Sequence, residues 1–317
     1  MRKNMKTLSL FASGLIVFGL IIALVGFFSG AHYSITLDGT SFKVNDQQKL
    51  KSESLPLEAF QNIDGQINDA DISFISANEY KIEIKYPADQ EWNYKVENGT
   101  LFIKHTESPQ FSFNLGFVTA NQATIKIYVP KDQQMKQFKL INKYGDTSIN
   151  GIASQSMDIV SNDGDLKLVN VNTEKLAIVN QYGDTTVQNV SADKISAKSN
   201  DGDMLFKNMN VLNAFISNQY GDTALQQINS KGLKLTSNDG DVSVKGSLKG
   251  RTVIHSSYGD VLITPSNPQK ELSYRLVSDY GDIIVDNKAS ESSVVSSENG
   301  DDSLKVNTQD GDIVLSF

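Results

Sequence analysis

A Gly-Asp dipeptide that returns every 19 residues constrains this chain more than any other feature of its sequence. The glycines of the unbroken run are Gly145, Gly164, Gly183, Gly202, Gly221, Gly240 and Gly259. Gly281 follows after 22 residues, Gly300 after a further 19, and a short last turn carries Gly311. A unit of this length cannot bury an apolar face alone, so the repeats must stack and share one core.

Apolar residues recur at fixed places in each repeat. The column three residues after each Asp is Ile149, Leu168, Val187, Phe206, Leu225, Val244 and Ile263. The column thirteen residues after it is Ile159, Ile178, Ala197, Ile216, Leu235 and Ile254. A third column runs from Ile152 to Ile228 and lapses at Ser247, and a fourth, from Met157 to Leu233, precedes the second by two residues. A spacing of two is the period of a strand with one buried face.

These columns predict an all-β fold, a right-handed parallel β-helix of 19-residue coils. Adjacent coils would lie about 4.8 Å apart, the usual strand spacing. The right hand is expected because crossovers between parallel strands favour it. The segments lack the 3.6-residue period and the caps of helical repeats. The prediction requires that Ile149, Leu168 and Val187 lie over one another in a dry interior.

The N-terminus predicts a membrane anchor before the β-helix. No charged residue occurs between Lys6 and Asp38, and 21 apolar residues at about 1.5 Å each span about 30 Å. We expect a basic cytoplasmic stub at 1–7 and a single transmembrane anchor at 8–30, with the remainder extracellular, because basic residues stay inside. The alternatives are a signal peptide cleaved near Ser29-Gly30-Ala31 and a buried globular helix.

The remaining chain divides into an N-terminal β region at 31–130, which we interpret as early coils plus a cap, and the solenoid repeats at 131–317. Residues 80–86 and 124–129 alternate as strands do, and Asn98-Gly99 is typical of a hairpin turn. A cap is expected because an open sheet edge recruits other chains.

Composition disfavours several functions. The net charge is −8 with a pI of about 5.0, which argues against nucleic-acid binding. The chain has no cysteine, so thiolate metal sites and disulfides are excluded. His32, His105 and His255 belong to no catalytic motif, so we expect neither an enzyme nor a cofactor. A polysaccharide-cleaving site would have to use Arg251 and Arg275, near the 22-residue step.

The aspartates after the glycines would form one column at single-strand spacing: Asp146, Asp165, Asp184, Asp203, Asp222, Asp241 and Asp260. At about 5 Å and an effective dielectric near 20, each neighbouring pair repels by roughly 3 kcal/mol before screening. Backbone N–H groups at the corner are the expected partners. Calcium is the alternative, since it takes carboxylate oxygens, although the glycine-rich repeat of calcium-binding β-rolls is missing.

The residue before each Gly alternates, so the full repeat is 38 residues. Tyr144, Tyr182, Tyr220 and Tyr258 take turns with Asp163, Asp201 and Asp239. This alternation separates the acidic residues by about two strand spacings, which relieves repulsion. The tyrosines would form a stripe that could stack on sugar rings or attract cationic peptides. The plainer interpretation is that each ring packs over its corner with a wet hydroxyl.

Several segments resemble a known bacterial family. Residues 125–130 (Ile-Lys-Ile-Tyr-Val-Pro), 143–146 (Lys-Tyr-Gly-Asp) and the recurrent Asp-Gly-Asp are similar to the family of proposed adhesins built from β-strand repeats, a domain of unknown function. Residues 55–60 and 97–101 fit its upstream pattern. With the N-terminal segment, the chain most resembles LiaG-type membrane proteins of Gram-positive envelope-stress operons. The resemblance implies a right-handed β-helix facing the envelope, without catalytic residues.

Two functions follow as expectations. In the first, the protein is an envelope-stress accessory, sensor or scaffold that binds another membrane protein or a cationic peptide. In the second, it is an adhesin-like module that binds cell-wall glycans, with Ca²⁺ at the aspartate column as an option. No nucleic-acid partner is expected under either.

Overall fold

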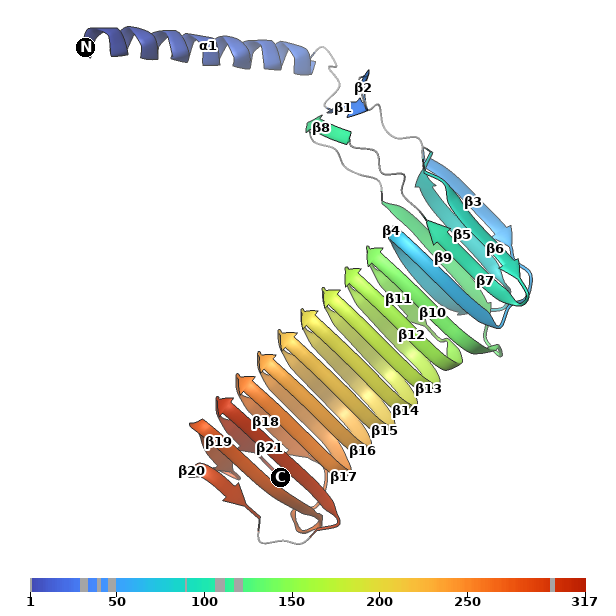
Figure 1. The fold of residues 1–317 in the computed structure, drawn as a ribbon, viewed down its shortest axis with the longest axis vertical. Helices are drawn as coiled ribbons and strands as arrows, with labels where there is room; N and C mark the ends of the chain where they lie inside the picture. The colour runs from blue at the N-terminus through green and yellow to red at the C-terminus, as the bar shows by residue number, and fades with distance from the viewer. Residues whose placement is uncertain are drawn as a thin grey trace. The chain divides into compact units, whose positions relative to one another are not determined.

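The repeats form long strands that pair in parallel (Figure 1). The computed structural model describes residues 2–28, 34–38, 41–44, 50–88, 90–105, 112–116, 122–296 and 300–317. The repeat strands are β10 (Gln134–Tyr144), β11 (Thr147–Asn150), β12 (Ala153–Asp163), β13 (Leu166–Tyr182), β14 (Thr185–Asp201), β15 (Met204–Tyr220), β16 (Thr223–Asp239) and β17 (Val242–Tyr258). From β12 to β16 each residue pairs with the one 19 positions later, so the sequence period is the pairing register.

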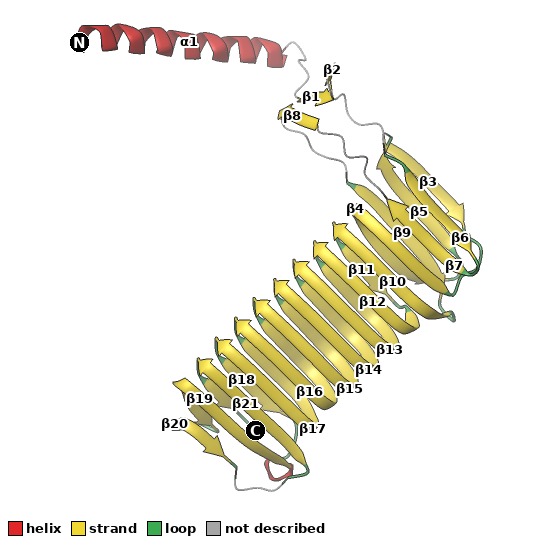
Figure 2. Cartoon of the chain, viewed as in Figure 1, coloured by secondary structure: helices red, strands yellow, loops and turns green. Residues whose placement is uncertain are grey.

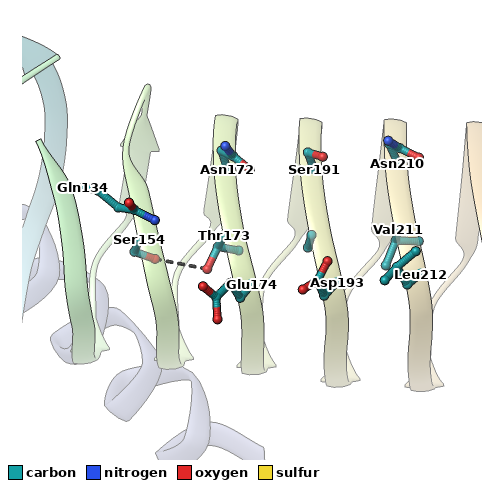
Figure 3. Close-up of a pocket in the computed structure, with 11 residues that line it drawn as sticks. Gln134, Ser154, Asn172, Thr173, Glu174, Ser191, Asp193, Asn210, Val211 and Leu212 are labelled. Atoms are coloured by element: carbon teal, nitrogen blue, oxygen red, sulfur yellow. Dashed lines mark hydrogen bonds between the residues drawn. The ribbon is translucent and has the colours of Figure 1, made fainter. Parts of the chain in front are cut away.

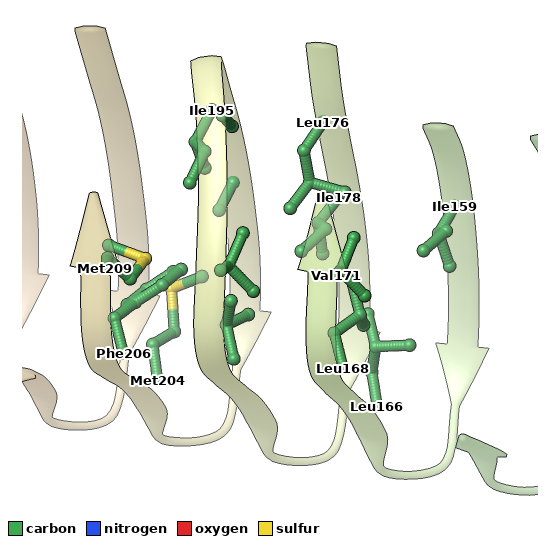
Figure 4. Packing of buried hydrophobic residues seen from close by; sticks show 14 of the residues in the cluster. Ile159, Leu166, Leu168, Val171, Leu176, Ile178, Ile195, Met204, Phe206 and Met209 are labelled. Atoms are coloured by element: carbon green, nitrogen blue, oxygen red, sulfur yellow. The ribbon is translucent and has the colours of Figure 1, made fainter. Parts of the chain in front are cut away.

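The core consists of the predicted columns. Ile149 pairs with Leu168 and Leu168 with Val187, and all three side chains are fully buried. Their stacking in a shared interior is therefore confirmed. Figure 4 shows Leu166, Leu168 and Val171 of one repeat beside Met204, Phe206 and Met209 further along the same interior. Buried and exposed side chains alternate along each strand, as expected for a strand with one dry face.

In each repeat, a residue in the left-handed backbone conformation lies a few residues after the Gly-Asp dipeptide. The residues there are Gly151, Asn170, Asn189, Asn208, Gln227 and Gly246, all with positive φ. Asparagine adopts this conformation more readily than most residues, and its side chain here also forms hydrogen bonds between adjacent repeats. The Asn189 amide donates to Asn170 and the Asn208 amide to Asn189, at 3.0 and 2.8 Å.

The lapse of the third column at Ser247 has a structural cause. The register between β16 and β17 shifts by one residue, so that Ser230 pairs with Leu248. Gly246 takes the place after Ile228, and the fully buried Leu248 adds an apolar side chain to the adjacent column, after Val211 and Ser230. The shift happens at Gly246, where a Cβ would stand 2.1 Å from the Ile228 carbonyl oxygen.

The N-terminal end of the stack begins earlier than residue 131. Its strands are β3 (Leu50–Pro56), β4 (Asn62–Ala77), β5 (Lys81–Pro87), β6 (Trp92–Glu97), β7 (Thr100–His105) and β9 (Ala123–Pro130). β4 pairs in parallel with β10 and β11 on one side and with β7 and β9 on the other. β5 and β6 then add antiparallel strands, and the predicted Asn98-Gly99 turn joins β6 to β7. Part of the predicted cap region is thus the first repeat itself.

At the C-terminal end the stacking order departs from the sequence order (Figures 1 and 2). The elements are β18 (Val261–Pro265), the 3₁₀ turn η1 (Gln269–Glu271), β19 (Leu272–Val285), β20 (Lys288–Val295), β21 (Asp302–Asp310) and β22 (Ile313–Leu315). β21 and β22 lie between β17–β18 and β19, in parallel with both. β20 turns back antiparallel to β19 and covers the outer edge. Gly300 contacts Glu271 and does not join the glycine column, whereas Gly311 follows Gly259 and Gly281 follows Gly311.

A second unit holds Met1–Lys49 and Ser108–Asn121. It contains α1 (Arg2–Phe28) and a three-stranded antiparallel sheet of β2 (Ser41–Val44), β1 (Ser34–Asp38) and β8 (Ser112–Gly116). Side chains 12–25 of α1 are all exposed. Within the part of the chain that the structure describes, no helix has the length and apolar character needed to cross a membrane. The end of the predicted anchor, residues 29–30, and the alternative cleavage site at 29–31 lie outside the described residues.

Candidate functional site

The Gly-Asp corner positions the candidate site. Gly183 has φ +118°, and a Cβ there would stand 2.4 Å from the Gly164 carbonyl oxygen of the preceding repeat. Gly164 meets Gly145 in the same way, at 2.3 Å. Only glycine combines this conformation with such a close approach, so successive corners stack directly.

The aspartates after these glycines form a continuous hydrogen-bonded ladder, here called the aspartate ladder. One carboxylate oxygen (Oδ1) of each Asp accepts the backbone N–H of the next, at 2.8–3.0 Å. In spatial order the members are Asp71, Asp146, Asp165, Asp184, Asp203, Asp222, Asp241, Asp260, Asp312 and Asp282. Charge-assisted bonds to N–H groups offset the repulsion between neighbouring carboxylates. This is the partner that the sequence predicted.

The aspartate ladder supplies no cage for a cation. Each Oδ1 is already used by a backbone donor, and neighbouring carboxylates repeat along a line. Among the residues described, no three His, Cys, Asp or Glu side chains converge as a metal site requires. The calcium alternative for Asp146 to Asp260 stays a prediction, to be tested with calcium and a chelator.

The alternating residues form a second column beside the ladder, here called the tyrosine–aspartate edge. Tyr144 pairs with Asp69 and Asp163, and the alternation continues through Tyr182, Asp201, Tyr220, Asp239, Tyr258 and Asp310. The first four tyrosines are 44–53% exposed, so their rings face solvent. The structure thus brings all four predicted tyrosines onto one edge.

The alternation survives the reordered C-terminus. In sequence, Tyr258 is followed by Tyr280, which would place two tyrosines in neighbouring repeats. In the structure, β21 brings Asp310 next to Tyr258, and the 30-residue register of β19 on β21 brings Tyr280 beyond Asp310. Tyr280 is 79% exposed and makes a fifth ring on the edge. Sequence reasoning missed Tyr280 because it followed chain order.

The interior carries the same two-repeat period. Asn142, Asn180 and Asn218 are buried in the tyrosine repeats, and Ser161, Ser199 and Ser237 take their place in the others. The Asn180 amide donates to the Gly183 carbonyl at 2.9 Å and to Thr185 Oγ1 at 3.2 Å. Asn218 repeats the pattern with Gly221. The asparagines therefore hold the corners beside Tyr144, Tyr182 and Tyr220 from the interior, whereas serines take this place beside Tyr258 and Tyr280.

A polar groove runs across the repeats on another side (Figure 3). It has a volume of about 280 Å³. Asn172, Ser191 and Asn210 line it together with the carboxylates of Glu174 and Asp193, and a Ser154–Thr173 hydrogen bond of 3.1 Å lies in it. Sequence reasoning did not single out this groove, although these residues recur at the repeat spacing.

The remaining candidates do not form one site, although Arg251 and His255 lie close together on β17. His105 is buried and stacks on Trp92, with ring centroids 4.2 Å apart. His255 and Arg251 lie on β17, and Arg275 lies on β19, without a carboxylate pair between them. His32 is outside the described residues. Among the described residues, these histidines and arginines do not form an acid, base and nucleophile constellation.

In the N-terminal strands, a cluster of side chains that share hydrogen bonds has shifted pKa values. Tyr86 and Tyr94 both donate to the Glu53 carboxylate at 2.5 Å, which lowers the pKa of Glu53. Burial, followed by the bond to Glu53, raises the pKa of Tyr94. This cluster ties β3 to β5 and β6 and has the character of a structural contact.

The fold and the corner motif agree with a recognised family. The model of the Toastrack DUF4097 family matches residues 60–316. The chain belongs to this family. No functionally curated protein matches it.

The solved structures that the chain matches include a proposed adhesin from Bacteroides fragilis, 12% identical, with a TM-score of 0.44, covering 86% of this chain and 98% of that one. A proposed adhesin from Parabacteroides distasonis is 12% identical, with a TM-score of 0.47 and the same coverage. A proposed lipid-binding protein from the same organism is 11% identical, with a TM-score of 0.47 and the same coverage.

Proposed function

We propose that this Toastrack protein is a non-enzymatic binding scaffold of the cell envelope. Its repeats make a right-handed parallel β-helix with one 19-residue coil per repeat. Residues 8–30 anchor it as a single-pass membrane protein, with the N-terminus in the cytoplasm and the β-helix outside. It acts as an accessory or sensor of envelope stress, of the LiaG-like type.

The tyrosine–aspartate edge carries this proposal. Every tyrosine from Tyr144 to Tyr258 stands between two aspartates of adjacent strands, about 4.8 Å away on each side. The aspartate ladder runs two residues further along the same corner, so two columns of carboxylates flank the rings. Lysine and arginine bind to aromatic faces and to carboxylates alike. The edge therefore suits a cationic peptide or a basic segment of another membrane protein.

The test uses the full chain in lipid nanodiscs and a cationic amphipathic peptide as the probe. Tyr182→Ala with Tyr220→Ala should weaken peptide binding by about ten-fold, because two central rings are lost. Phe215→Ala removes one exposed ring from a different face and should change it by less than about two-fold. Equal losses in both variants would contradict the proposal.

The adhesin-like alternative has its own supporting observation, the polar groove of Figure 3. Amide and carboxylate groups such as those of Asn172, Asn210 and Asp193 bind sugar hydroxyls well. Under this alternative the protein attaches to cell-wall glycans. Binding to purified cell wall, compared between the parent and an Asn172→Ala, Asn210→Ala variant, tests it, and unchanged binding would remove the groove from consideration.

A further inference from the structure

One sheet face has the opposite electrostatic character to the Gly-Asp corner. Residues 194–198, 213–217, 232–236, 251–255 and 303–307 lie side by side in β14, β15, β16, β17 and β21. We call this surface the basic face. Its outward positions include Lys194, Phe215, Lys234, Arg251, His255 and Lys305 and hold no carboxylate.

The basic face stands out against the rest of the molecule. The chain carries a net charge of −8, yet two of its three arginines, Arg251 and Arg275, lie on or beside this face. Arg275 pairs directly with Lys305, and Lys175 pairs directly with Lys194. Like charges opposite one another destabilise a sheet. The ion pairs among the described residues are Lys81–Glu83 and Lys95–Glu97. The lysine and arginine side chains of the basic face therefore take part in no ion pair with a described carboxylate.

A hollow of about 470 Å³ lies in the middle of the basic face. Phe215, Lys231, Lys234, Arg251 and His255 line it, together with Gly232, which has no side chain. Phe215 is 44% exposed, and Lys194 Nζ lies 5.3 Å from the centre of its ring. The hollow therefore combines a flat apolar surface with a ring of donors.

The titration of His255 reflects the same environment. Its pKa is lowered, first by burial and then by the charges of Lys305 and Lys234. No carboxylate faces the ring from β16, β17 or β21, and its one hydrogen-bonding neighbour is the Asn307 amide at 3.4 Å. An anion placed here would reverse the effect of the two lysines.

We propose that the basic face binds a linear anionic polysaccharide, with Phe215 stacking on a sugar ring while Lys234 and Arg251 hold its phosphate or carboxylate groups. The proposal deepens the adhesin-like alternative above and names a site for it. Cations lie on β14, β16, β17 and β21, and β15 contributes Phe215, so a polymer running along the stack meets either a cation or the aromatic ring on each strand.

Other polyanions fit less well. Single-stranded nucleic acid is held by several large aromatic platforms, whereas Phe215 and the smaller imidazole of His255 are the rings on the basic face. A lipid surface needs a group of apolar side chains to insert, and the outward apolar residues here are Phe215 and the half-buried Val253. Glu174 and Asp193 border the face towards the earlier repeats, so the ligand is centred on β15, β16, β17 and β21.

The experiment measures binding of polygalacturonate and of a phosphomannan to the full chain in nanodiscs of zwitterionic lipid. Lys234→Gln with Arg251→Gln should weaken binding of at least one of them by about ten-fold or more, and Phe215→Ala by several-fold. Lys207→Gln with Lys245→Gln removes the same charge from exposed positions of β15 and β17 that lie off this face, and should change binding by less than about two-fold. On binding, the pKa of His255, followed by NMR, should rise.

Four outcomes would overturn the proposal. They are no binding of either anionic glycan, equal losses in the two charge variants, tighter binding of anionic vesicles or of oligothymidine than of the glycans, and equal binding of neutral dextran. Melting curves of the variants identify any loss that comes from misfolding. Cationic-peptide binding by the Tyr182→Ala, Tyr220→Ala variant is a separate measurement. It tests the tyrosine–aspartate edge, so a negative result there does not contradict glycan binding at the basic face, and the reverse also holds.

Discussion

The central repeats and the C-terminal end are built from the same motif but assembled differently. From β12 to β17 each strand pairs with the next in sequence, and the 19-residue spacing sets the register. After β18 the order of strands in the stack no longer follows the sequence. β21 and β22 occupy the position next to β17 and β18, and β19 and β20, which come earlier in the chain, lie beyond them. The repeat thus determines the register in which two adjacent strands pair, but it does not determine which strand of the chain pairs with a given edge.

The difference has a physical reason at the sheet edge. A strand that simply ended the stack would expose unpaired N–H and C=O groups, which recruit other chains. Inserting β21 and β22 places the last residues between two partners, and Tyr274 packs on Phe317 beside them. The strand at the outer edge of the sheet is then β20, which is short and antiparallel to β19. The pairing of β20 with β19 has a break in its register, so β20 is a poor template for the addition of another strand.

Removing the inserted segment should have the largest effect. Deleting residues 300–317 removes the buried side chains of Leu304, Val306, Ile313 and Leu315 and leaves β19 without its parallel partner. At about 1.5–3 kcal/mol for each buried side chain, the loss is of the order of 6–12 kcal/mol, confined to this end. Hydrogen exchange should show that β19 and β20 lose protection while β13 and β14 keep theirs. Uniform loss along the stack would mean that the end is not a separate cooperative region.

Substitution at a central corner should follow in size. Gly183→Ala forces a Cβ to within 2.4 Å of a backbone oxygen at φ +118°, and should cost about 3 kcal/mol or more. Gly99→Ala, at φ +68° in open space in the N-terminal hairpin, is the matched control and should cost about 1 kcal/mol. Urea denaturation measures both, and equal costs would show that the corner can relax.

The buried asparagines come next. Asn180→Ser copies the alternate repeat and removes the bonds to Gly183 and Thr185, so it should destabilise by about 1–3 kcal/mol. Ser199→Ala, at the equivalent place in the next repeat, should cost less, since no bond of that hydroxyl is present to lose. If Ser199→Ala proved the more damaging, the two-repeat period would not be set from inside.

Acid should loosen the N-terminal end before the central repeats. Tyr86 and Tyr94 hold the pKa of Glu53 below its ordinary value of 4.5, so its stabilising contribution is full above 4.5 and disappears as the pH falls through the lowered value. The protection of β3 and β6 from hydrogen exchange, relative to the intrinsic rate at each pH, should therefore fall below about pH 4.5 in the parent, and Glu53→Gln should abolish that pH dependence. The same fall in protection in Glu53→Gln would assign it to another group.

The smallest effect is expected on the aspartate ladder. Asp165→Asn keeps an oxygen that can accept the N–H of Asp184, and should change stability by less than about 1 kcal/mol. Melting temperatures with calcium and with a chelator should coincide for the parent and the variant. A chelator-dependent fall in the parent alone would restore the calcium alternative.

The sequence by itself determined the repeat register, the buried columns and the Gly-Asp corner, because all three depend on residues 19 apart that contact each other directly. Ile149, Leu168 and Val187 could be placed in the core from spacing alone, as could the four tyrosines on one edge. Local stereochemistry also identified the Asn98-Gly99 turn.

Only the tertiary structure decided the features that break the period. A one-residue register shift at Gly246 buries Leu248 opposite Ser230, and a change in stacking order brings Asp310 between Tyr258 and Tyr280. The basic face likewise joins residues of β14 to β17 with residues of β21. The last two features depend on which strand pairs with the exposed edge of β17, and distant segments compete for the backbone hydrogen bonds of that edge.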